Sequence, residues 1–145
     1  MDFKNIFFDT NVVLDIIDKT RDNHKTANSV FKFCIFSNYK ICISEDMLST
    51  IFYIHKDKKQ VLEFFNIIQN DWTISPFGYT LIKNAITLSL ENNIDLEDTF
   101  QCLCAKENGC KILITNDTKF YDCGLEIYKT AEFLDKYNYA GFRHD

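Results

Sequence analysis

Short apolar runs alternate with longer stretches of helical periodicity along this 145-residue chain. The runs at residues 4–8, 39–43, 72–75, 111–115 and 126–128 are typical of short buried strands. Between them, apolar side chains recur every three to four residues, which predicts one or two helices in each interval. Strands that alternate with helices in this way predict an α/β domain with a mainly parallel sheet covered on both faces.

Seven helices are expected between and after these strands. Asp9 or Thr10 is placed to cap the first helix, Ser44 to cap the third, and Gly109 to end the sixth. The helices are predicted around residues 12–17, 24–37, 47–52, 61–68, 79–91, 96–109 and 130–137.

Size and composition predict one globular domain. The chain is 46% hydrophobic and 26% charged, which is ordinary for a globular protein. We expect residues 1–137 to form a single domain and residues 138–145 to be a loose C-terminal tail. No apolar run is long enough to cross a bilayer, and the first residues lack a signal-peptide layout, so we expect a cytoplasmic protein without a membrane partner.

The charge balance limits how the chain can bind nucleic acid. Sixteen basic against 21 acidic residues give a net charge of −5, which argues against binding by bulk electrostatics alone. It does not exclude a nucleic-acid enzyme whose acidic site is neutralised by metal. The densest basic cluster, residues 55–59, is interpreted as a solvated helix junction in preference to an RNA contact.

The six cysteines show no C-x-x-C spacing. We therefore expect free, mostly buried thiols in preference to a zinc site or a disulfide framework. They are Cys34, Cys42, Cys102, Cys104, Cys110 and Cys123.

Acidic residues follow two of the predicted strands and begin one of the predicted helices. Asp9 follows the first strand, Asp117 follows the fourth, and Asp95, Glu97 and Asp98 stand at the start of the sixth helix. Each acid alone has an ordinary explanation, as a helix cap or as part of an Asx turn. In a parallel sheet, however, both strand ends meet at one edge, and a helix that begins at that edge brings its first acids within reach.

Carboxylates gathered in this way require a counter-charge. A pair 4 Å apart repels by ~4 kcal/mol at an effective dielectric constant near 20, so such a cluster protonates or binds a cation. Oxygen ligands without histidine or thiol favour Mg²⁺ or Mn²⁺ over zinc. Hard cations held by few carboxylates keep open positions for water and phosphate oxygens, which suits phosphodiester hydrolysis.

Three segments resemble the motifs of PIN-domain ribonucleases, most closely the small bacterial VapC-like toxins of toxin–antitoxin modules. The segments are Asp9-Thr10-Asn11, Asp95-Leu96-Glu97-Asp98 and Thr115-Asn116-Asp117, and together they span nearly the whole chain. The resemblance implies a PIN-like three-layer α/β/α fold with a central sheet of four or five strands. It also implies a Mg²⁺- or Mn²⁺-dependent endoribonuclease that leaves a 5′-phosphate and is held inactive by an antitoxin protein.

The resemblance also assigns roles to individual residues. It makes Asp9, Asp98 and Asp117 the metal ligands. Asn11 and Thr115 would orient these ligands or the attacking water, and Glu97 would be an auxiliary acid.

The third helix departs from the family pattern. PIN proteins usually carry a glutamate there, and Thr50 stands at the corresponding position. A threonine hydroxyl is a weak metal ligand, so either a second metal is poorly held or Asp46, one turn earlier on the same face, replaces the glutamate. Glu45 faces elsewhere on the helix.

Thr50 motivates an alternative function, a catalytically inactive PIN-like module that binds RNA or protein. A phosphatase of the haloacid-dehalogenase type is a weaker alternative, because those enzymes carry D-x-D after the first strand and this chain has Asp9-Thr10-Asn11. A phosphotransfer receiver domain is weaker still, because the paired acids of that class are missing after the first strand.

An RNA substrate would need basic groups near the acids. Lys119, two residues after Asp117, is one candidate, and Lys19 and Arg21 after the first helix are two others. An ordinary surface role is at least as good an explanation for all three. The third and fourth helices could present a face to a partner or to a second copy in a homodimer, or could turn that face into the core.

Overall fold

A five-stranded, entirely parallel sheet forms the centre of the computed structural model, which describes residues 4–137. The strands are β1 (Lys4–Phe8), β2 (Tyr39–Ser44), β3 (Thr73–Ser75), β4 (Ile112–Ile114) and β5 (Glu126–Tyr128). Their order across the sheet is β3-β2-β1-β4-β5, with every neighbouring pair parallel. The prediction of a mainly parallel sheet of four or five strands is confirmed.

Helices fill the intervals between strands, as the apolar periodicity predicts. Within the described residues they are α1 (Thr10–Ile17), α2 (His24–Phe36), α3 (Asp46–Ile54), α4 (Lys58–Ile68), α5 (Gly78–Asn92), α6 (Leu96–Glu107) and α7 (Thr130–Tyr137). No helix in this part of the chain combines the length and apolar character needed to span a bilayer.

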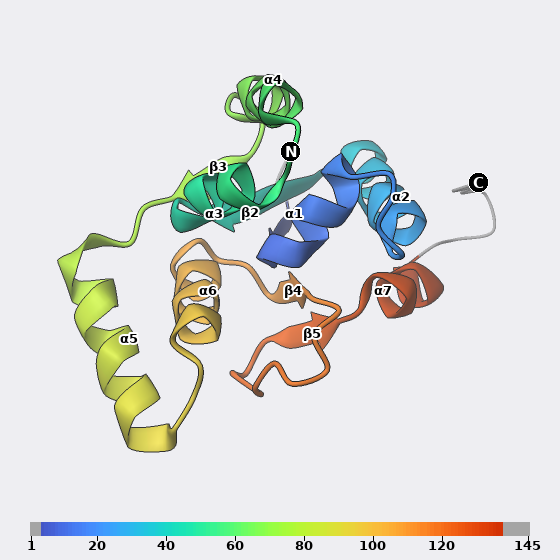
Figure 1. The fold of residues 1–145 in the computed structure, drawn as a ribbon. Coiled ribbons are helices and arrows are strands. Elements are labelled where there is room, and N and C mark those ends of the chain that lie inside the picture. The colour runs from blue at the N-terminus through green and yellow to red at the C-terminus, as the bar shows by residue number, and fades with distance from the viewer. Residues whose placement is uncertain (1–3, 138–145) are drawn as a thin grey trace.

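The strand order places helices on both faces of the sheet (Figure 1). From β1 the chain steps outward to β2 and β3, and then returns to the other side of β1 to form β4 and β5. Because parallel crossovers are right-handed, this reversal moves α5 and α6 to the face opposite α1 and α2. Helix α7 packs against α2, and α5 packs against α6, so the fold has three layers.

The core is centred on β1, the middle strand. Ile6, Phe7 and Phe8 are completely buried, as expected for a strand covered on both faces. The Phe8 ring meets Trp72 edge-on with centroids 5.8 Å apart, and Trp72 in turn meets Phe31 at 5.6 Å. Each such buried side chain contributes about 1.5–3 kcal/mol to folding, so the strand that carries Asp9 is firmly anchored.

Asp9 caps the first helix in position, as expected, but Ser44 does not cap the third. Asp9 occupies the N-cap position of α1, but its side chain makes no capping hydrogen bond. The N-cap of α3 is Glu45, because the Ser44 hydroxyl is used by the Asp46 carboxylate. Gly109 follows the end of α6 with φ +69°, a conformation that favours glycine.

The expectation that all six cysteines are free is wrong for two of them. Cys102 on α6 and Cys123 in the β4–β5 loop form a disulfide. Sequence spacing gave no signal for this pair, because 21 residues separate the two and the approach depends on how the loop folds over α6. The other four cysteines are free and buried, namely Cys34, Cys42, Cys104 and Cys110.

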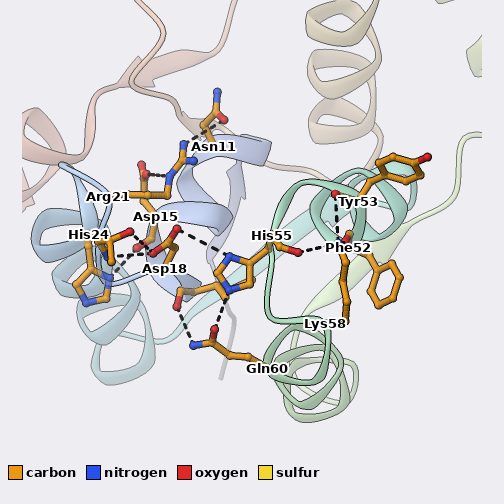
Figure 2. Close-up of polar contacts among 12 residues, drawn as sticks. Asn11, Asp15, Asp18, Arg21, His24, Phe52, Tyr53, His55, Lys58 and Gln60 are labelled. Atoms are coloured by element: carbon orange, nitrogen blue, oxygen red, sulfur yellow. Dashed lines mark hydrogen bonds and ion pairs between the residues drawn. The ribbon is translucent and has the colours of Figure 1, made fainter.

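The basic cluster after α3 is a helix junction, as interpreted from the sequence (Figure 2). The Lys58 ammonium donates to the backbone carbonyl oxygens of Phe52, Tyr53 and His55. These are carbonyls at the C-terminal end of α3, which a cation stabilises. The expected tail, residues 138–145, lies outside the described residues.

Candidate active site

Acids from three separate segments meet at the C-terminal edge of the sheet. Asp9 follows β1 and Asp117 follows β4, and these strands are neighbours. The Asp9 amide donates to the Ile114 carbonyl at 3.0 Å, which ties the two strand ends together. With the first turn of α6, they surround a pocket of about 320 Å³ lined by Asp9, Asn11, Asp95, Glu97, Asp98, Asp117 and Lys119.

Asp9 is held by a side chain from the neighbouring strand. Only 7% of Asp9 is exposed, and its Oδ2 accepts a hydrogen bond from Thr115 Oγ1 at 2.7 Å. Burial raises the pKa of Asp9 above its ordinary value, and hydrogen bonds from Thr115 and Gln101 partly offset that rise. Asp9 is therefore a buried acid without a cation partner among the described residues.

Asp117 combines a local structural role with a place in the pocket. Its Oδ1 accepts from the Lys119 amide at 2.9 Å, which is the Asx turn expected from sequence. The Asp117 amide donates to Thr115 Oγ1 at 3.1 Å. The Thr115 hydroxyl thus contacts Asp9 and Asp117 together and fixes their relative position.

Among the acids of the pocket, Asp98 has the most strongly raised pKa. Its amide donates to Asp95 Oδ1 at 3.1 Å, so Asp95 caps α6 as predicted. Burial raises the pKa of Asp98 to about 7, with further increases from the negative charges of Asp95, Asp9, Asp117 and Glu97. Repulsion among these carboxylates is the electrostatic signature of a site that favours a cation.

Glu97 belongs to a hydrogen-bond network that sequence reasoning missed. Thr10 Oγ1 donates to Glu97 Oε1 at 3.2 Å, and Gln101 Nε2 donates to both Thr10 Oγ1 and Glu97 Oε1, at 3.3 and 3.4 Å. Gln101 is fully buried, and its Oε1 has no partner within the described residues. Leaving a buried carbonyl unpaired costs about 1–3 kcal/mol. The sequence signal was available, since Gln101 follows Glu97 by one turn.

The predicted basic residues occupy different places, and Figure 2 shows Arg21 beside Asp15 and Asn11. Lys119 lines the pocket. Arg21 Nε donates to the buried Asp15 at 2.6 Å, and its terminal nitrogen reaches Asn11 Oδ1 at 3.4 Å, so it touches the site through Asn11. Lys19 is exposed and is not among the residues that line the pocket.

The third helix approaches the site without lining it. Asp46 stands at the start of α3 and accepts a hydrogen bond from Ser44. Its charge contributes to the raised pKa of Glu97, after burial and the charge of Asp9. Thr50 lies one turn later in the same helix and is half-buried. Neither residue borders the pocket.

The pocket suits a hard divalent ion in its donor chemistry. Its potential ligands are carboxylate and amide oxygens, and Mg²⁺ and Mn²⁺ prefer oxygen ligands. Among residues 4–137, no lysine or arginine forms an ion pair with Asp9, Glu97, Asp98 or Asp117. In this same part of the chain, no three His, Cys, Asp or Glu side chains are already close enough to hold a metal.

Comparison with characterised proteins gives a relative that spans nearly the whole chain. Over 142 residues the chain is 34% identical to Ribonuclease VapC1 of Aquifex aeolicus (strain VF5), covering 95% of this chain and 99% of that protein.

Solved structures share the fold. One is the crystal structure of VapBC2 from Rickettsia felis bound to a DNA fragment from their promoter, with a TM-score of 0.64 and 22% identity over 86% of this chain and 98% of that one. Another is VapC20 from Mycobacterium tuberculosis, described as a toxin that cleaves the sarcin–ricin loop, with a TM-score of 0.65 and 14% identity over 79% and 92% of the two chains. A third is a toxin–antitoxin complex from Klebsiella pneumoniae, with a TM-score of 0.66 and 17% identity over 86% and 97%.

The family itself follows from two agreeing matches. Residues 6–124, which run from β1 into the β4–β5 loop and include every acid of the pocket, match the PIN domain. The second match is the near full-length relative, which is named as a ribonuclease, VapC1. The chain is therefore a member of the PIN domain family.

Proposed function

We propose that this protein is an endoribonuclease that hydrolyses RNA phosphodiester bonds and acts as the toxin of a toxin–antitoxin pair. The observation that carries the proposal is the meeting of Asp9, Asp98 and Asp117 at one pocket on the C-terminal edge of the sheet. The 34% identity to a ribonuclease of nearly equal length supports the same conclusion. We also propose that residues 1–137 act as a single PIN domain and that the protein works in the cytoplasm.

Asp9, Asp98 and Asp117 would hold Mg²⁺ or Mn²⁺, with Asp46 as a further candidate near Glu97. The ion would neutralise phosphate oxygens and lower the pKa of attacking water. Thr115 orients Asp9 and the loop that carries Asp117. Asn11, exposed at the pocket rim, and Glu97 as auxiliary acid would orient water or the scissile phosphate.

Substrate binding would depend on few basic residues. Lys119 lines the pocket and would contact an RNA phosphate beside the acids. Arg21 forms an ion pair with Asp15. We therefore propose that its main role is to hold Asn11 and that its contact with the substrate is secondary. Lys19 is exposed in the α1–α2 loop and would contact RNA farther from the cleaved bond.

A protein partner fits the exposed apolar side chains of α3 and α4. Tyr53 and Ile54 on α3, and Leu62 and Ile67 on α4, are each more than half exposed. Exposed apolar groups of this size on neighbouring helices are typical of an interaction surface. We propose an antitoxin protein as the partner, in line with the toxin–antitoxin complexes among the structural relatives. The alternative partner for this surface is a second copy of the chain, in a homodimer formed through the same helices.

RNA cleavage with added Mn²⁺ tests the proposed function. The purified chain should cut RNA with Mn²⁺, lose this activity with EDTA, and lose at least about a hundredfold in Asp117→Asn. Asp122→Asn is a matched control, because Asp122 in the same loop also accepts an amide hydrogen bond from the residue two positions on, and it lies outside the pocket.

The control should cleave as fast as the unaltered protein, since asparagine preserves both Asx turns. If the unaltered protein cuts no RNA, or cuts no faster than Asp98→Ala, the nuclease proposal is wrong. RNA binding without cleavage would instead favour an inactive PIN-like module.

A further inference from the structure

Gln101 is a buried amide on α6 that lies behind the acidic pocket without lining it. It follows Glu97 by one helical turn, so the two side chains lie on the same face of α6. Its Nε2 donates to Thr10 Oγ1 at 3.3 Å and to Glu97 Oε1 at 3.4 Å. Its side chain also partly offsets the rise in the pKa of Asp9 that burial causes. One side chain therefore contacts the start of α1 and the start of α6 together.

The direction of these hydrogen bonds is determined by Thr10. Its hydroxyl donates to Glu97 Oε1 at 3.2 Å, so the threonine oxygen remains free to accept from Gln101. Turning the amide over would place its carbonyl oxygen against the carboxylate of Glu97. The N–H end of Gln101 therefore faces the acids, and Gln101, Thr10 and Glu97 form a closed triangle.

The other end of the amide argues against a purely structural role. Gln101 has no exposed surface, and its Oε1 has no hydrogen-bond partner within residues 4–137. Methionine would fill the same space in α6 without burying an unpaired carbonyl. Packing alone does not explain an amide at this position, whereas donation to Glu97 and Thr10 does.

We propose that Gln101 is a positioning residue for the acidic site, which holds Glu97, directly and through Thr10, beside the three acids that would receive the divalent ion. This inference rests on the proposed function. Glu97 is otherwise an exposed side chain at a helix start, and such a side chain samples several rotamers. Fixing it in advance lowers the entropy that ion binding has to remove.

Calorimetric titration of Mn²⁺ into the Gln101→Met variant tests this role. Partners that orient metal ligands typically change affinity by 10–100-fold when removed, so we expect Mn²⁺ to bind about tenfold more weakly. The melting temperature should stay the same or rise, because the unpaired carbonyl is gone. A merely structural Gln101 would give the opposite pair of results, a lower melting temperature with unchanged Mn²⁺ affinity, and that would overturn the inference.

Thr10→Val provides a second variant from the other side of the triangle. It keeps the branched shape and removes the hydroxyl, and it should weaken Mn²⁺ binding by a similar factor. Because the hydrogen bonds form one unit, the double variant should be little worse than either single one. Multiplied effects in the double variant, or unchanged affinity in both single variants, would overturn the inference. Thr10→Val decides the question alone if Gln101→Met does not fold.

The two proposals fail in different ways. If the unaltered chain binds Mn²⁺ but cuts no RNA, the nuclease proposal fails, and the affinities of the variants still decide the role of Gln101. If the unaltered chain cuts RNA and both variants bind Mn²⁺ as tightly as it does, only the Gln101 inference fails.

Discussion

Thr115 shows how one hydroxyl organises two acids that lie far apart in sequence. It donates to the Asp9 carboxylate and accepts from the Asp117 amide. Asp9 is thereby turned away from the capping role that its position before α1 would allow. At the scale of single residues, the proposed metal site is therefore arranged by neutral side chains, namely Thr115, Thr10 and Gln101.

The raised pKa of Asp98 predicts how stability changes with pH. Burial and neighbouring carboxylates raise this pKa from 3.8 to about 7, so between these values the folded chain keeps a proton that the unfolded chain releases. Without metal, this contribution to the free energy of unfolding is full below about pH 4 and disappears as pH rises to about 7. Urea unfolding in EDTA across this range should show the decline, and Asp98→Asn should reduce it. An identical pH dependence in both proteins would contradict the assignment.

Arg21 has a structural role that can be separated from RNA binding. Its guanidinium pairs with the buried Asp15 at 2.6 Å. Removing one partner of a buried pair leaves an uncompensated charge, and because Arg21 is one-third exposed we expect Arg21→Ala to cost about 2 kcal/mol of stability. Chemical denaturation checks this value. An unchanged stability with a large loss of RNA affinity would show that Arg21 primarily serves the substrate.

Residue types predicted the acids of the pocket better than the residues that hold those acids in place. Asp9, Asp98 and Asp117 stand out because each follows a strand or begins a helix. Gln101 was missed because its spacing one turn after Glu97 is a weak signal until the burial of that helix face and the position of Thr10 are known. Arg21 was expected near the substrate, but Asp15 lies on the buried face of α1 and accepts its hydrogen bond.

The β4–β5 connection is the element that most distinguishes this fold from a regular α/β sheet. Parallel strands usually require a helical crossover, but residues 115–125 contain no helix. The Cys102–Cys123 disulfide joins this loop to α6. It therefore links the helix that carries Asp98 to the loop that carries Asp117.

Removing this covalent link should destabilise the protein. Closing a loop of this length stabilises the folded state by about 3 kcal/mol in the chain-entropy account. The double variant Cys102→Ser, Cys123→Ser should lose roughly this amount in urea unfolding. A reducing agent should have a similar effect on the unaltered protein and none on the variant. Equal stability of oxidised and reduced protein would show that the disulfide contributes nothing to the fold.

Element types were predictable because strands and helices differ in apolar period, whereas the path of this loop was not. The sequence predicted five strands and the helices between them, and the structure has them within a few residues of the expected bounds. The position of Cys123 beside α6 depends on tertiary packing of the loop. Spacing between cysteines carries no information about that packing.

The whole molecule carries a net charge of −5. RNA affinity should therefore be modest and should depend on a few basic residues near the pocket. If Lys119, Lys19 and Arg21 supply at most three phosphate contacts, the logarithm of affinity should fall against the logarithm of salt with a slope near −2, at about −0.7 per contact. Fluorescence anisotropy with the Asp98→Asn variant would measure this slope. Lys119→Ala should make the slope shallower. Binding that is indifferent to salt would remove these residues from the interface.

At the scale of the whole fold, the reversal of strand order beside β1 is what makes the pocket. Alternating strands and helices predicted a parallel sheet, but the pattern alone does not state which strands are neighbours. The order β3-β2-β1-β4-β5 puts β1 next to β4. Asp9 and Asp117, 108 positions apart in the chain, meet for this reason, as general rules for α/β sheets suggest.

A crystal structure of the protein soaked in Mn²⁺, with anomalous diffraction data, would show whether Asp9, Asp98 and Asp117 hold one metal ion. We expect an anomalous peak in the pocket, at about 2.0–2.2 Å from carboxylate oxygens of Asp9, Asp98 and Asp117. Asp117→Asn crystals should show a weaker peak or none. Fully soaked crystals with Mn²⁺ bound elsewhere, and with these three carboxylates unchanged, would contradict the claim.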